Sequence, residues 1–187
     1  MNKSHAKNSP AKKSPAKTST TKSFVNAKSE FSMLFERMYE ICEENNWGDP
    51  FSYARSREIH MANLLGHRVA PTLSGANAFN KDGECEYKTT IGKSISAKYN
   101  GVSVQDTWEN QIEYLNKQKI GKYKNHYFGR YDGSKIVEIY VMHYTKVLEF
   151  LLPRLQKQYS NSKKRKDPRL GCTINKSFII ANSKRIV

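Results

Sequence analysis

Charge and apolar residues are spread unevenly along this chain, so only its middle can supply a hydrophobic core. The formal net charge is +15 over 187 residues. Residues 1–28 carry seven lysines and no acidic residue, and residues 160–187 carry eight basic residues against Asp167. Residues 29–159 hold 17 basic and 16 acidic residues. Two cationic ends suit the binding of a polyanion such as nucleic acid, with a solubilising role as the alternative.

The first 23 residues cannot contribute to that core. They are low in complexity, consist largely of Lys, Ser, Pro and Ala, and contain no aromatic residue. Segments of this kind bury too little apolar surface to offset the entropy of folding. We therefore predict a disordered basic tail over residues 1–23 and a single folded domain over residues 24–187, a usual length for one domain.

Several classes of protein are excluded by what the sequence lacks. No stretch approaches the roughly 18 apolar residues that cross a membrane, and there is no apolar signal-peptide core. The motifs of nucleotide-binding loops, zinc proteases and paired-cysteine metal sites are absent, so we expect no small-molecule cofactor. Three widely spaced cysteines form no disulfide framework. We expect no membrane association, and a location in the cytoplasm or nucleus.

Hydrophobic periodicity predicts helices first, then a run of strands, then a mixture of helices and strands. We predict helices over residues 29–47, 103–119 and 143–159, and a further helix that starts near Ser52 or Ser56 and stops at Gly66. We predict strands over residues 68–70, 76–79, 84–90, 126–131, 135–141, 172–174 and 177–181, with Pro153 kinking or restarting the last helix. This order indicates an α/β or α+β fold with a mixed central sheet flanked by helices.

The segment from Ser74 to Thr89 is the most informative for chemistry. Side chains in a strand alternate between its two faces, so Glu84, Glu86 and Lys88 share one face. Cys85 lies on the other face, where we expect it to be buried. Three charged side chains are therefore gathered on one side of a single strand.

The register of the preceding hairpin decides which residue faces this cluster. A loop of residues 80–83 places Asn77 opposite Glu86, whereas a two-residue turn at Asp82 and Gly83 places Asn77 opposite Lys88. Both registers leave Asn77 on the charged face.

Such a cluster suits a metal-dependent phosphodiesterase, in which oxygen ligands hold Mg²⁺ and a lysine orients water or offsets charge. The Glu86-Tyr87-Lys88 strand, following Gly75-Ala76-Asn77-Ala78, resembles the motif of the PD-(D/E)xK nuclease superfamily, in particular type II restriction endonucleases. The resemblance implies a restriction-endonuclease-like core, Glu86 as a metal ligand and Lys88 as the catalytic lysine. It also implies Glu58 as a further catalytic carboxylate, contributed by a helix.

The chain departs from that motif at one position, because Asn77 stands where an acidic residue is expected. An amide oxygen can coordinate Mg²⁺ but supplies no negative charge. Three explanations remain open: Glu84 supplies the missing carboxylate, Asp82 supplies it, or the site is weakened or inactive. We favour an altered but active metal site of Asn77, Glu84 and Glu86.

Two basic segments are candidates for binding DNA. The stronger is Lys163, Lys164, Arg165 and Lys166, which repel one another without an anion. This cluster also fits a nuclear localisation signal. The second segment includes Lys122 and Lys124, for which a solvated surface is the alternative. His126 either touches DNA or has a structural role.

Together these features predict a Mg²⁺-dependent, sequence-specific endonuclease for double-stranded DNA. The resemblance implies a homodimer, since two-fold symmetry lets two copies cut both strands of a palindrome. The alternative is a non-catalytic protein that binds DNA or RNA through its basic ends. A nuclease acting on RNA with the same fold would differ only in substrate.

Overall fold

The computed structural model describes residues 20–71, 74–162, 166 and 168–187, with side chains from residue 26 onward. The chain divides into two units, residues 1–40 and residues 41–187. Helix α1 (Thr20–Glu44) begins in the first unit and ends in the second, and starts nine residues before the predicted Ser29. Residues 1–19 of the predicted tail lie outside the described residues.

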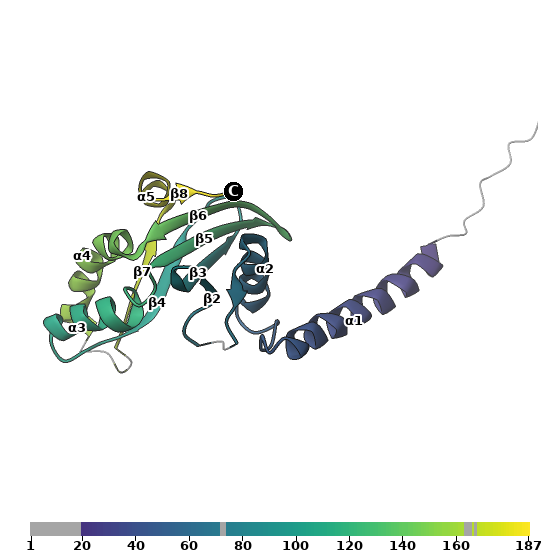
Figure 1. Ribbon diagram of the computed structural model, residues 1–187, viewed down its shortest axis with the longest axis horizontal. Helices are drawn as coiled ribbons and strands as arrows, with labels where there is room; N and C mark the ends of the chain where they lie inside the picture. Colours follow the sequence, from purple (N-terminus) through teal and green to yellow (C-terminus); the bar gives the residue numbers. More distant parts are fainter. Residues whose placement is uncertain (1–19, 72–73, 163–165, 167) are drawn as a thin grey trace, which may run out of the picture. The chain divides into compact units, whose positions relative to one another are not determined.

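The second unit is built on a six-stranded mixed sheet with the strand order β1-β2-β3-β5-β6-β8 (Figure 1). Its strands are β1 (Arg68–Val69), β2 (Ala78–Asn80), β3 (Gly83–Ile91), β5 (Asn125–Asp132), β6 (Lys135–His143) and β8 (Lys184–Arg185). Only β3 and β5 pair in parallel, so a long crossover must join them. That crossover contains β4 (Ala97–Ser103), α3 (Trp108–Tyr114) and the π-helix η1 (Leu115–Lys119).

Alternating side chains bury both faces of this sheet. On one face, Tyr87 and Tyr127 pack with Ile59 and Met61 of helix α2 (Arg55–Leu65). On the other face, Phe128 and Met142 belong to a second and larger hydrophobic cluster, which includes Leu151 of helix α4 (Tyr144–Ser162). The sheet is therefore the middle layer between α2 and α4.

A separate two-stranded sheet of β4 and β7 (Arg169–Ile174) packs in the larger cluster. Helix α4 lies beside β7, and Gln158 ties them together by bonding both backbone groups of Gly171. Helix α5 (Lys176–Asn182) follows, with the Asn175 side chain accepting a hydrogen bond from the Phe178 amide.

The predicted mixed sheet with flanking helices is confirmed at the level of fold class, and its largely antiparallel pairing makes it α+β. Two predicted elements are wrong. Residues 177–181 are helical because Asn175 caps a helix there. The predicted helix over 103–119 begins only at Trp108, since residues 97–103 pair with β7 as strand β4. Helix α4 continues through Pro153 without an interruption.

Candidate active site

Strand β3 places the predicted charged residues on one face. Glu84, Glu86 and Lys88 are partly exposed, whereas Cys85 and Tyr87 between them are buried. Burial raises the pKa of the Cys85 thiol to about 11. The thiol is therefore protonated at neutral pH and does not act as a nucleophile.

The hairpin register places Asn77 beside Glu86. Phe79 pairs with Glu84, as the loop of residues 80–83 predicted. Asn80 also pairs with Gly83, so Lys81 and Asp82 form the turn. The alternative two-residue turn at Asp82 and Gly83 is wrong. The Asn77 Oδ1 atom accepts a hydrogen bond of 2.7 Å from the Tyr87 amide. The amide side chain thus continues the strand pairing by one step beyond β2.

A cleft of about 520 Å³ opens where β2 ends and leaves the edge of β3 uncovered. It is lined by Tyr53, Glu58, Ser74, Gly75, Asn77, Glu86, Lys88, Lys119 and Tyr123. Helix α2 reaches this edge, where Arg57 Nε donates to Thr89 Oγ1 at 3.1 Å. The cleft therefore gathers four residues predicted from the sequence: Glu58, Asn77, Glu86 and Lys88.

Glu58 is held in the cleft by a buried arginine. The Nη1 atom of Arg55 lies 3.5 Å from Glu58 Oε2, and the Arg55 side chain is fully buried. Arg55 is fixed in turn by the carbonyl groups of Trp47, at 2.7 Å, and Ala70. This guanidinium orients one of the two carboxylates in the cleft.

Lys88 is positioned by an ion pair and by an aromatic ring. Its Nζ atom bonds Glu86 Oε1 and lies 5.3 Å from the centroid of the Tyr99 ring. The Tyr99 hydroxyl is 2.8 Å from His126 Nδ1, and His126 Nε2 is 3.0 Å from the Ile120 carbonyl. A carbonyl only accepts, so Nε2 carries the proton and Nδ1 accepts from Tyr99.

His126 therefore has the structural role left open by the sequence, and the histidine is fully buried. Burial lowers its pKa to about 3, and the neighbouring charge of Lys88 acts in the same direction. Burial also raises the pKa of Tyr99, together with the negative charge of Glu86. Both residues are neutral supports beneath the charged pair of Glu86 and Lys88.

Three residues of the cleft carry carboxylate or amide oxygen atoms that could hold a cation: Glu58, Asn77 and Glu86. No cluster of three or more carboxylate, histidine or cysteine ligands occurs among the residues that the structure describes. Mg²⁺, however, is commonly bound by one or two carboxylates together with waters and substrate phosphates. The cleft offers two carboxylates, Glu58 and Glu86. Asn77 is the weaker ligand, because its oxygen is neutral and already accepts from the Tyr87 amide.

Glu84 and the loop residues Lys122 and Lys124 form ion pairs outside the cleft. Lys122 Nζ is 3.1 Å from Glu84 Oε2, and Lys124 Nζ is 3.3 Å from Asp82 Oδ1. None of these four residues lines the cleft. They attach the loop before β5 to the hairpin of β2 and β3.

The remaining predicted DNA-binding residues are in the segment after α4. Lys163, Lys164 and Arg165 lie outside the described residues, and Lys166 is exposed. Helix α4 leads into this segment and carries Arg154 and Lys157.

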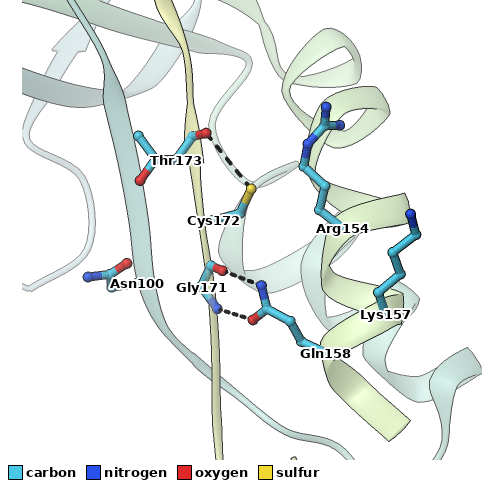
Figure 2. A pocket seen from close by; sticks show the side chains of 7 residues that line it. All are labelled: Asn100, Arg154, Lys157, Gln158, Gly171, Cys172 and Thr173. Atoms are coloured by element: carbon cyan, nitrogen blue, oxygen red, sulfur yellow. Dashed lines mark hydrogen bonds between the residues drawn. The ribbon is translucent and has the colours of Figure 1, made fainter. Parts of the chain in front are cut away.

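Arg154 and Lys157 help to line a second hollow of about 510 Å³ (Figure 2). The other lining residues are Asn100, Gln158, Gly171, Cys172 and Thr173. Burial raises the pKa of the Cys172 thiol despite the nearby charge of Arg154. With two cations, no carboxylate and a protonated thiol, this hollow can contact an anion but has no acid-base or metal-binding group.

Tyr53, Ser74 and Gly75 also line the cleft, although none of them was among the site residues predicted from the sequence. Tyr53 is 97% exposed and has a backbone φ of 52°, in the left-handed region that tyrosine rarely adopts. Nothing in the local sequence signals this position. Gly75 belongs to the Gly75-Ala76-Asn77-Ala78 part of the nuclease-like motif and Ser74 precedes it, so the motif could have suggested both.

The chain matches no protein-family model, and none of the curated proteins is similar enough to count as a relative. No helix in the described part of the chain has the length and apolar character needed to cross a membrane.

Proposed function

We propose that the chain is a Mg²⁺-dependent endonuclease for double-stranded DNA, related in its active site to type II restriction enzymes of the PD-(D/E)xK superfamily. The observation that carries the proposal is the cleft shared by Glu58, Asn77, Glu86 and Lys88. These residues come from a helix, a loop and a strand, and the resemblance to the nuclease motif implies a role for three of them, Glu58, Glu86 and Lys88. The proposal includes the restriction-endonuclease-like core.

Glu58 and Glu86 are the residues that would hold Mg²⁺. Bound there, the ion would polarise the scissile phosphate and favour deprotonation of the attacking water. Lys88 donates a hydrogen bond to a phosphate oxygen or to that water, exchanging part of its ion pair with Glu86. Tyr99 and His126 keep the ammonium group in place, because they are buried and bonded to each other.

The surroundings of the cleft support a nucleic-acid substrate. Lys119 lines the cleft and is exposed, so its ammonium can pair with a backbone phosphate. The exposed ring of Tyr53 can stack on an unpaired base or a sugar. Lys163, Lys164, Arg165 and Lys166, together with Arg154 and Lys157, supply further contacts to phosphates.

The neutral Asn77 favours one alternative, a protein that binds nucleic acid without cutting it. Loss of one negative charge weakens metal binding, and the basic ends bind DNA with or without catalysis.

The proposed enzyme acts as a homodimer inside the cell. Three cysteines that are free in the structure accord with a reducing compartment.

The test is cleavage of plasmid DNA by the purified chain in Mg²⁺, with and without a chelator, beside Glu86→Ala and Asn77→Asp. We expect discrete fragments that vanish with the chelator and with Glu86→Ala. A gain of cleavage in Asn77→Asp would show that the amide limits the reaction. Salt-dependent binding without cleavage by any variant would refute the nuclease and leave the binding protein.

A further inference from the structure

Helix α1 presents an apolar stripe to solvent. Phe31, Leu34, Phe35 and Met38 follow the spacing of one helix face and are 70%, 62%, 48% and 39% exposed. The rings of Phe31 and Phe35 lie one turn apart and are tilted by 31°, with centroids 6.4 Å from each other. The rest of the described helix surface is mixed, with the charged Glu30, Glu36, Arg37 and Glu40 beside the exposed Met33 and Tyr39. Contiguous exposed apolar surface of this kind is typical of an interaction site.

We propose that this stripe pairs with the same stripe of a second copy, the two α1 helices running antiparallel. The inference does not depend on the proposed nuclease activity. A two-fold pair lets one apolar surface cover an identical one. The four side chains expose roughly 400 Å² on each copy. With the flanking side chains, the pair approaches the lower end of the area in specific interfaces, so we expect a dimer of micromolar affinity.

The charges beside the stripe select the antiparallel direction. Glu30 and Arg37 are seven residues apart and lie on the same flank of the helix. Antiparallel helices bring the same flank of each together. When Phe31 lies opposite Leu34 of the second copy, Glu30 meets Arg37 of the second copy, and the symmetry repeats this ion pair.

A parallel pairing offers no such complementarity. It places Glu30 beside Phe35 of the second copy and Arg37 beside Cys42 of the second copy. In the single chain Arg37 bonds Glu40 at 3.0 Å. Both side chains are exposed, so replacing this ion pair by one with Glu30 of the second copy costs little free energy.

The first test measures the mass of the full chain by sedimentation equilibrium, without DNA, at about 10 to 100 μM, the range that a small interface requires. We expect a dimer for the natural sequence and a monomer for Leu34→Glu. Met33→Glu is the matched control, since Met33 is 61% exposed on the opposite side of the helix and should leave the dimer intact. Circular dichroism confirms that each variant is folded.

The second test reverses the charges. Glu30→Arg alone and Arg37→Glu alone should each weaken dimerisation about tenfold, because each creates two like-charge contacts. The double variant should restore it. A monomeric natural chain, a dimer that survives Leu34→Glu, or a double variant no better than the single ones would overturn the proposal. These outcomes concern mass alone, so they are separate from success or failure of the nuclease.

Discussion

At the residue scale, Asn77 joins the fold to the proposed chemistry. Its side-chain oxygen accepts the hydrogen bond of the buried Tyr87 amide, where a paired strand would offer a backbone carbonyl. This bond fixes the adjacent Glu86 in β3. An acidic residue there could accept the same hydrogen bond. The departure from the nuclease motif therefore alters the charge of the cleft while the hydrogen bond that supports the strand is kept.

We predict that Asn77→Ala lowers the free energy of unfolding by about 1 to 3 kcal/mol, since the Tyr87 amide loses its acceptor inside the protein. Asn77→Asp should be nearly as stable as the natural chain, because a carboxylate oxygen accepts in the same place. Urea unfolding of the three proteins checks this. Equal stability of the alanine variant would show that the hydrogen bond is unimportant.

His126 gives a prediction about pH. Its pKa is lowered from 6.5 to about 3 by burial. Between these two pKa values the unfolded chain binds a proton at His126 that the folded chain does not bind. The free energy of unfolding therefore falls as the pH decreases from about 6.5 toward 3. The contribution approaches about 1.4 kcal/mol per pH unit below the unfolded pKa.

His126→Gln should remove that contribution, so its stability should fall less steeply between pH 6.5 and 5. Denaturant unfolding at several pH values measures both slopes. The other histidines are present in both proteins, and their contributions cancel in the difference. Parallel pH profiles would contradict the burial of a neutral His126.

At the element scale, the cleft depends on how helix α2, which carries Glu58, packs on the sheet. Gly129 of β5 lies close against α2, because a Cβ atom there would lie 2.7 Å from the Sδ atom of the buried Met61. Gly129→Ala should cost about 1 to 3 kcal/mol of stability through overpacking. It should also displace α2, which carries Glu58.

Thermal unfolding of a double-mutant cycle checks this contact. Met61→Val shortens the side chain that the new methyl group meets, so it should recover part of the loss in the Gly129→Ala background. Strictly additive losses would show that the two residues do not contact each other.

The elements show what the sequence could and could not predict. Strand β3 was predicted because its side chains alternate between the two faces, and the hairpin of β5 and β6 because two runs rich in apolar and aromatic residues flank the turn at Asp132 and Gly133. Strand β4 was missed, since Gly101 and a register shift between Tyr99 and Val102 interrupt its pattern. Residues 177–181 form a short apolar run, for which periodicity does not separate helix from strand.

The candidate site likewise has features that the sequence could predict and features that it could not. Alternation within β3 predicted which charges share a face, and the hairpin loop predicted the position of Asn77. The pairing of Glu84 with Lys122 was not predictable, because it joins residues brought together only by the parallel β3 and β5 crossover. The same holds for Arg55, whose burial depends on two distant carbonyl groups.

At the scale of the whole molecule, the excess of positive charge predicts a salt-dependent interaction with DNA. Replacing Lys163, Lys164, Arg165 and Lys166 by Gln should reduce the slope of log affinity against log salt by about 3 to 4, since each phosphate contact contributes about 0.9. Lys146→Gln is the control, because Lys146 already pairs with Glu149 at 2.6 Å. Fluorescence anisotropy over a salt series measures both. An unchanged slope in the fourfold variant would place the DNA contacts elsewhere.

The central claim is that the cleft, and not the charged strand face in general, cuts DNA. Glu86 and Glu84 test it, since they lie two residues apart on one face of β3 and only Glu86 lines the cleft. The measurement is the single-turnover rate of plasmid cleavage in Mg²⁺ for Glu86→Gln and Glu84→Gln. We predict a loss on the order of 100-fold or more for Glu86→Gln and a rate within about threefold of the natural chain for Glu84→Gln. Equal losses in both variants, or cleavage that survives Glu86→Gln, would contradict the account.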